Sequence, residues 1–161
     1  MALQFAQTSG SISWQLTQSN TPFIQSSQGP DSVSNGFAWT TGAGFATTAI
    51  ALNLTIAVSS NTTIDLQAQV DLLNQAQVLT KVYAIQIIPS GSDCVLSPGA
   101  TDPLIWFFGS ATDTIKVKDG GIFLLANTTS QAVSASVKNL KLANPSASNI
   151  LTVKLVIIGG V

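Results

Sequence analysis

Residues 47–89 read TTAIALNLTIAVSSNTTIDLQAQVDLLNQAQVLTKVYAIQIIP, and this stretch decides the fold class. Apolar and polar residues alternate in it three times in succession. The apolar members are Ile50, Leu52, Leu54, Ile56, Val58, then Ile64, Leu66, Ala68, Val70, Leu72, then Leu79, Tyr83, Ile85 and Ile87. Because successive strand residues point to opposite faces, such a period of two predicts a sheet with one buried and one wetter face. The stretch therefore predicts the central three-stranded meander of an all-β domain. Within it, residues 62–73 also have apolar residues at helical spacing, so a helix remains the alternative there.

Segments typical of strands lie on both sides of this meander. They are residues 3–8 and 11–17, with a turn at Gly10, then 36–40, 104–108, 112–117, 121–126, 131–140 and 150–158. Turn residues separate them, most clearly Asp119 and Gly120, since Asp-Gly supplies the positive φ values of tight turns. About ten strands, at spacings of roughly 8–12 residues, are typical of an antiparallel β-sandwich or jelly roll. We expect one such domain over residues 1–161, with little or no helix.

Two segments rich in Gly, Pro and Ser interrupt the strand pattern. They are residues 18–35 and 89–103, and both are predicted to be loops. Loops longer than about 12–15 residues in a compact domain are usually functional or adaptable. We therefore expect both to be contact surfaces, with mobile connections as the alternative.

The charge composition is the most unusual property of the chain. Only 8% of the residues are charged, against about 25% in typical soluble domains. The chain has no Glu, Arg or His, whereas Ser, Thr, Gln and Asn make up 57 of its 161 residues. A surface that is polar but uncharged is readily buried against copies of itself, and the net charge of −1 also favours association. The alternative is a monomer that its hydroxyl and amide groups keep in solution.

This composition excludes several classes of function. Without His, catalysis by Ser-His-Asp or Cys-His groups is excluded, and so are His metal sites. The chain has no basic cluster to neutralise phosphates, so we expect no nucleic-acid partner. No stretch approaches the roughly 20 apolar residues of a transmembrane helix, and the N-terminus does not resemble a secretory signal, so we expect no membrane partner and synthesis in the cytoplasm. We predict no catalytic, cofactor-binding or metal-ligating residues.

Weaker chemical signals remain, each with a simpler structural reading beside it. Four aspartates within 27 residues offer oxygen ligands for calcium, but solvated turn residues explain them as well. A covalent Lys–Asn bond is conceivable for three of the lysines, and N-x-S/T triplets occur by chance in a chain this rich in Ser and Thr. Four aromatic residues are candidates for a sugar-stacking platform, although each lies in an apolar segment that core packing would use. The four aspartates are Asp93, Asp102, Asp113 and Asp119, and the three lysines are Lys116, Lys118 and Lys138. The N-x-S/T triplets begin at Asn53, Asn61 and Asn127, and the four aromatic residues are Trp14, Trp39, Tyr83 and Trp106.

The C-terminal third resembles the small β-sandwich virion proteins of tailed bacteriophages. The resemblance rests on TIKVKDGGIFLLANTTSQAVSASVKNLKLANPSASNILTVKLVIIGGV, in which a Gly-Gly step leads into an apolar strand, a polar hairpin, an Asn-Pro-Ser turn and a last strand ending in glycine. It implies a non-enzymatic structural protein: a capsid, capsid-lining or capsid-decoration component, or a head–tail or tail component, present in many copies in the virion. No site residues are carried over, because the resemblance has none.

We therefore expect a homo-oligomer whose partners are copies of itself and other virion proteins. The expected assembly surfaces are the two loops, the exposed edge strands and the polar face of the meander, with the terminal segments MALQF and LVIIGGV as points of strand exchange. That polar face carries Asn53, Thr55, Thr63, Asp65, Gln67, Gln69 and Asp71. The alternative function is a glycan-binding or adhesin-type module.

Overall fold

The computed structural model describes residues 6–20, 24–39, 48–70 and 75–161, with residues 6–20 and 24–39 described by their backbone. These residues form strands and connecting turns, and no helix long and apolar enough to cross a membrane occurs among them. The strands are β1 (Ala6–Asn20), β2 (Ile24–Trp39), β3 (Thr48–Ile56), β4 (Asn61–Asp65), β5 (Gln69–Val70), β6 (Ala76–Gln77), β7 (Lys81–Ser90), β8 (Cys94–Pro98), β9 (Ile115–Val117), β10 (Phe123–Ala132), β11 (Asn139–Ala143) and β12 (Leu151–Gly160). The predicted all-β fold is confirmed.

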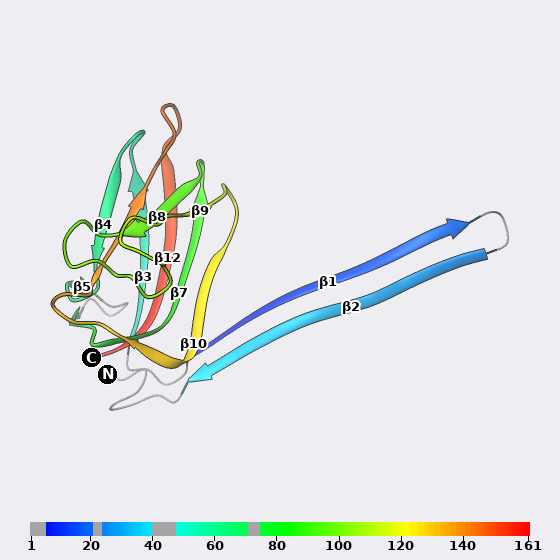
Figure 1. Cartoon of the computed structure of the whole chain (residues 1–161), viewed down its shortest axis with the longest axis horizontal. Coiled ribbons are helices and arrows are strands. Elements are labelled where there is room, and N and C mark those ends of the chain that lie inside the picture. Colours follow the sequence, from blue (N-terminus) through cyan, green and yellow to red (C-terminus); the bar gives the residue numbers. More distant parts are fainter. Residues whose placement is uncertain (1–5, 21–23, 40–47, 71–74) are drawn as a thin grey trace.

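Eight of these strands form two four-stranded antiparallel sheets that make a sandwich (Figure 1). One sheet has the order β10-β7-β12-β3 and the other β4-β11-β8-β9. The pairs are nested along the chain: β3 with β12, β4 with β11, β7 with β10, and β8 with β9. Strands far apart in sequence therefore hold the sandwich together.

The core lies between the two sheets, and the period-two pattern explains it. In β12, Leu151, Val153, Leu155 and Ile157 are fully buried and alternate with exposed or half-buried residues. From the other sheet, Leu96 of β8 and Leu140 and Leu142 of β11 are equally buried in the same core. The predicted strand at residues 150–158 is confirmed.

The predicted central meander is wrong in its pairing. β3 and β7 lie in one sheet but are separated by β12, and β4 belongs to the opposite sheet. The second alternation, residues 62–73, contains the short strands β4 and β5 rather than one long strand or a helix, with residues 71–74 outside the described part. A period of two shows which residues face the core, but not which strand is the neighbour.

The predicted loop at residues 18–35 is also wrong. β1 and β2 pair in antiparallel register from Ala6 opposite Trp39 to Asn20 opposite Ile24, so most of this segment is strand. Gly10 lies within β1 rather than at a turn. The two strands form a long ribbon that leaves the sandwich, with β2 against β10 at its base (Figure 1). We refer to β1 and β2 together as the ribbon.

The structure also corrects the predictions for residues 89–103, for residues 104–108 and for the C-terminal segment LVIIGGV. The 89–103 segment contains β8, so only part of it is loop. Residues 104–108 join no sheet; instead Leu104 and Phe108 are buried from a turn-rich connection, while Ile105 is 46% exposed. The C-terminal LVIIGGV lies mostly in β12, which pairs on both sides, so it has no free edge for strand exchange. Positive φ at Gly120 confirms the predicted turn at Asp119 and Gly120.

Asn144 fixes the turn between β11 and β12. This residue is 2% exposed, and its Nδ2 donates hydrogen bonds to the carbonyl oxygens of Ile56 (3.2 Å), Ala57 (3.1 Å) and Asn149 (2.8 Å). Its Oδ1 accepts the Ser146 N–H at 3.0 Å. A buried amide with all its groups engaged therefore ties the β11–β12 turn to the end of β3.

We expect Asn144→Ala to lower the free energy of unfolding by about 2 kcal/mol, because it removes a buried donor from the carbonyl of the buried Ile56 and from two part-buried bonds to Ala57 and Asn149. Chemical denaturation measures this change. The control is Asn149→Ala, since the Asn149 side chain is exposed and the carbonyl that Asn144 binds remains. Equal stability of the two variants would contradict the role assigned to Asn144.

Candidate functional site

One cluster of charged side chains joins two turns at one end of the sandwich. Asp93, between β7 and β8, lies 3.2 Å from the Lys116 Nζ and 3.0 Å from the Lys118 Nζ. Its other oxygen accepts the Asp119 N–H at 3.0 Å, and the Asp119 carboxylate accepts the Gly91 N–H at 2.9 Å. The reciprocal bonds clamp the β7–β8 turn to the β9–β10 turn.

This arrangement keeps Asp93 ionised. The Asp119 N–H, followed by Lys118 and Lys116, lowers the pKa of Asp93 to about 2. A carboxylate with so low a pKa, already engaged on both oxygens, is poorly suited to carry a proton near neutral pH. The cluster therefore serves as a structural clamp.

The other residues with predicted chemistry are dispersed. Of the four aspartates, the structure brings Asp93 and Asp119 together, whereas Asp113 accepts a hydrogen bond from Ser110 at 2.8 Å. No three His, Cys, Asp or Glu residues in the described part of the chain are grouped as metal ligands would be. Lys138 binds Asp65 at 2.7 Å, so it also faces a carboxylate rather than an Asn.

Cys94 is buried in the core. Its exposure is 0%, and burial raises the pKa of its thiol to about 11. Since the thiolate is the reactive form, this cysteine is inert toward nucleophilic chemistry.

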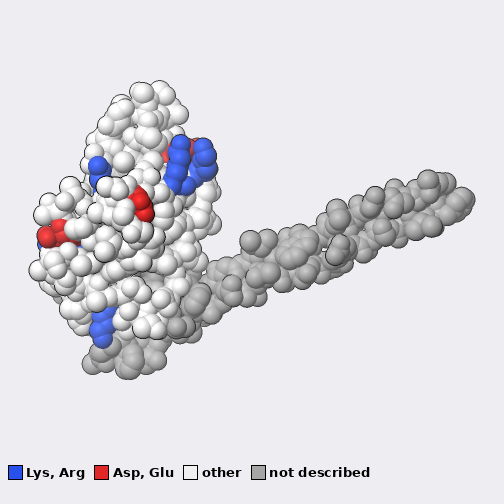
Figure 2. All heavy atoms as spheres, in the orientation of Figure 1, with Lys and Arg blue, Asp and Glu red and all other residues white. Residues whose placement is uncertain are grey.

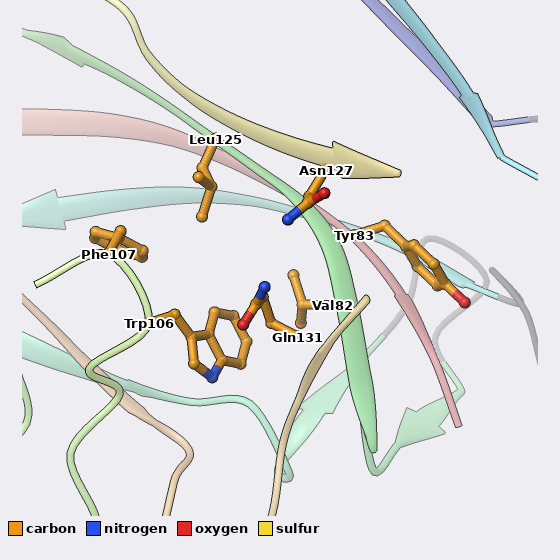
Figure 3. Close-up of a pocket in the computed structure, with 7 residues that line it drawn as sticks. All are labelled: Val82, Tyr83, Trp106, Phe107, Leu125, Asn127 and Gln131. Carbon is orange, nitrogen blue, oxygen red and sulfur yellow. The ribbon is translucent and has the colours of Figure 1, made fainter. Parts of the chain in front are cut away.

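A small cavity brings two of the predicted aromatics together. It has a volume of about 130 Å³ and lies where the pairing of β10 with β7 shifts register between Ala126 and Gln131. The lining residues are Val82, Tyr83, Trp106, Phe107, Leu125, Asn127 and Gln131. In Figure 3 the Asn127 and Gln131 amides lie in the middle of the lining residues, while the Tyr83 ring points away from the other labelled side chains.

Local bonds hold the walls of this cavity. The Trp106 Nε1–H donates to the Ala132 carbonyl at 3.1 Å, and the Asn127 Oδ1 accepts the Thr129 N–H at 3.2 Å. Trp14 and Trp39 lie in the ribbon strands. The combination of Trp106 with two amides was not predictable from sequence, because these residues come from separate elements without a shared motif.

The predicted polar contact face is divided between two sheets. Asn53 and Thr55 lie on β3, whereas Thr63 and Asp65 lie on β4. Asp65 is engaged by Lys138, and the Gln67 N–H donates to its Oδ1 at 2.8 Å. Asp71 and the N-terminal MALQF lie outside the described residues. The predicted polar residues therefore do not lie on one face of a single sheet.

The ribbon and the sheet edges are the remaining candidates for interaction. Figure 2 shows that the visible face of the described sandwich carries only small, separate groups of charged atoms. The rest of that face presents uncharged groups. Such a surface offers little electrostatic resistance to close contact with another protein.

No protein-family model, curated protein or solved structure matches this chain.

We expect Asp93→Asn to destabilise the fold at pH 7. The pKa of Asp93 falls from its ordinary 3.8 to about 2 on folding, so the ionised form stabilises the native state above pH 3.8. That contribution decreases as the pH falls through this window and is lost below about 2. Urea denaturation of both proteins between pH 2 and 7 measures it.

The difference in stability between wild type and Asp93→Asn should therefore narrow toward low pH. Added salt should also reduce it at pH 7, because Lys116 and Lys118 are largely exposed. A difference that stays constant from pH 7 to pH 2 would contradict the clamp.

Proposed function

We propose that this chain is a non-enzymatic structural subunit that works by self-association, as a virion component of the tailed-bacteriophage kind. The observation that carries the proposal is the ribbon. Strands of 15 and 16 residues pair with each other and leave the sandwich, with β2 against β10 at the base (Figure 1). A two-stranded ribbon is marginally stable by itself in water, so one of this length needs a further surface to pack on.

The sandwich topology supports the same proposal. We infer that the nested pairs β3·β12, β4·β11, β7·β10 and β8·β9 make up a jelly roll, in which a long folded-over hairpin wraps into two sheets. Viral capsid proteins and lectins both use this architecture. Because a fold does not by itself decide function, the choice between these classes depends on the surface.

The surface favours assembly. A charged fraction of 8% leaves little like-charge repulsion between neighbouring copies. Net charge keeps proteins monomeric through mutual repulsion, and the net charge of −1 supplies almost none. These properties suit a subunit that exists in many contacting copies inside a virion assembled in the host cytoplasm.

A glycan-binding module is the second candidate, and the cavity beside β10 is the observation that favours it. An indole face and two amide groups are the kinds of group that stack on and hydrogen-bond to a sugar ring. At about 130 Å³, however, the cavity is smaller than the roughly 300–1,000 Å³ of usual ligand pockets. The ribbon is therefore stronger support for assembly than the cavity is for glycan binding.

We expect the purified full-length chain to form particles much larger than the 16.6 kDa monomer. Size-exclusion chromatography with light scattering, over a range of concentrations, measures the mass, and negative-stain imaging shows whether rings, shells or sheets form. A glycan array with wild type and Gln131→Ala tests the second candidate. A monodisperse monomer whose sugar binding depends on Gln131 would overturn the assembly proposal.

A further inference from the structure

β3 is an open edge of the sandwich. Within the described residues it pairs with β12 alone, in a register without a shift from Thr48 to Ile56. Its sequence, TAIALNLTI, contains no charged residue, proline or glycine. An edge strand has a row of unpaired backbone N–H and C=O groups on its free side, so β3 is a template for another strand.

The other three edges are protected in ways that β3 is not. β9 has three residues, one of them Lys116, and β4 has five and ends at the ion-paired Asp65. β10 has a register shift after Ala126, and β2 lies against it. Short strands, charges, irregular pairing and covering segments all discourage edge-to-edge association. β3 is therefore the edge best suited to receive a strand.

Burial along β3 indicates that a neighbour is missing. Ile50 and Ile56, toward its ends, are 0% and 3% exposed, but Leu52 and Leu54 between them are only half-buried although they pack on the core. Their partners on β12 are fully buried, so the incomplete cover is on the free side of β3. A strand added there would cover both leucines.

The ribbon has the complementary property. Its register places Ile12 opposite Val33 and Thr8 opposite Phe37, and positions two residues apart share a face. One face of its basal half therefore carries ten positions, of which six are apolar. They are Ala6, Thr8, Gly10, Ile12 and Trp14 of β1 and Asp31, Val33, Asn35, Phe37 and Trp39 of β2, whereas Gln7, Ser9, Ser11, Ser13, Ser32, Ser34, Gly36 and Ala38 lie on the other face. A ribbon with one face richer in apolar positions, whose strands pair only with each other among the described residues, is suited to extend another sheet.

We propose that the ribbon of one copy pairs along β3 of a second copy and completes its sheet. The inference rests on the proposed function and specifies the interface. The occupant is another copy because the ribbon runs away from its own sandwich (Figure 1), and its two strands pair only with each other among the described residues, so that its edges are available to a neighbour. Both partners are also nearly free of charge: β3 has none, and the ribbon strands have only Asp31.

Two single-cysteine variants, mixed in equal amounts, test this pairing in the full-length chain. One carries Thr55→Cys at an exposed position of β3, and the other carries Ser13→Cys or Ser32→Cys in the ribbon. The native Cys94 is fully buried and does not compete for the reagent. A short bismaleimide should link the two variants into a covalent dimer, whereas Thr63→Cys, exposed on β4 of the other sheet, should give no link with the ribbon variants.

A matched pair of lysine variants provides the second measurement. Leu54→Lys places a charge among the inward-facing residues at the open edge, and Asn53→Lys places the same charge on the exposed face of the same strand. Leu54→Lys should lose the multimer peak, and Asn53→Lys should keep it. Circular dichroism confirms that both variants are folded, and if Leu54→Lys is unfolded, the cross-linking result decides alone.

The possible results distinguish a failure of the β3–ribbon pairing from a failure of the proposed self-association. Multimers that form without the β3–ribbon cross-link would overturn the pairing and leave the assembly function standing. A chain that is monomeric at every concentration would overturn both. A cross-link between β3 and the ribbon, with assembly lost in Leu54→Lys alone, would support the pairing.

Discussion

The pairing of β12 on both sides is the interaction on which the rest of the structure depends. From Leu151 to Gly159 it pairs with β3, and from Thr152 to Gly160 it pairs with β7. β12 thereby pairs with β3, the first strand of the sandwich, and closes it. The other nested pairs, β4·β11, β7·β10 and β8·β9, lie between β3 and β12 in the sequence. Gly159 allows β7 to come close, because a Cβ there would lie 2.8 Å from the Lys81 carbonyl oxygen.

The same closure determines which surfaces remain available. With β12 and β7 in the middle of one sheet, the edges are β3 and β10, and β2 lies against β10. Among the described residues, β3 pairs on one side only, carries no charge and is incompletely covered at Leu52 and Leu54. The sheet edge that has no described neighbour therefore also lacks the lysines that usually protect an edge.

The sequence predicts the strands whose alternation is decided locally, and it does so well for β7 and β12. It does not predict their neighbours, since Ile85 or Leu155 would alternate in the same way beside any partner. The predicted strands at residues 11–17 and 36–40 correspond to parts of β1 and β2, but their pairing and the strand residues within 18–35 were missed. Pro30, Gly29 and a run of serines are typical of loops, and no local pattern indicates a strand whose stability comes from elsewhere. The Asp93 clamp and the cavity at Trp106 join residues from separate turns and strands, so only the folded chain brings them together.

Hydrogen exchange, measured by mass spectrometry at low and high protein concentration, reports on both the pairing of β12 and the proposed pairing of the ribbon with β3. In this account the β12 amides are strongly protected at both concentrations, because β3 and β7 pair with β12 within one copy. The ribbon and the free side of β3 should gain protection together as the concentration rises. Protection of the ribbon that is independent of concentration, or that rises without any change in β3, would contradict the account.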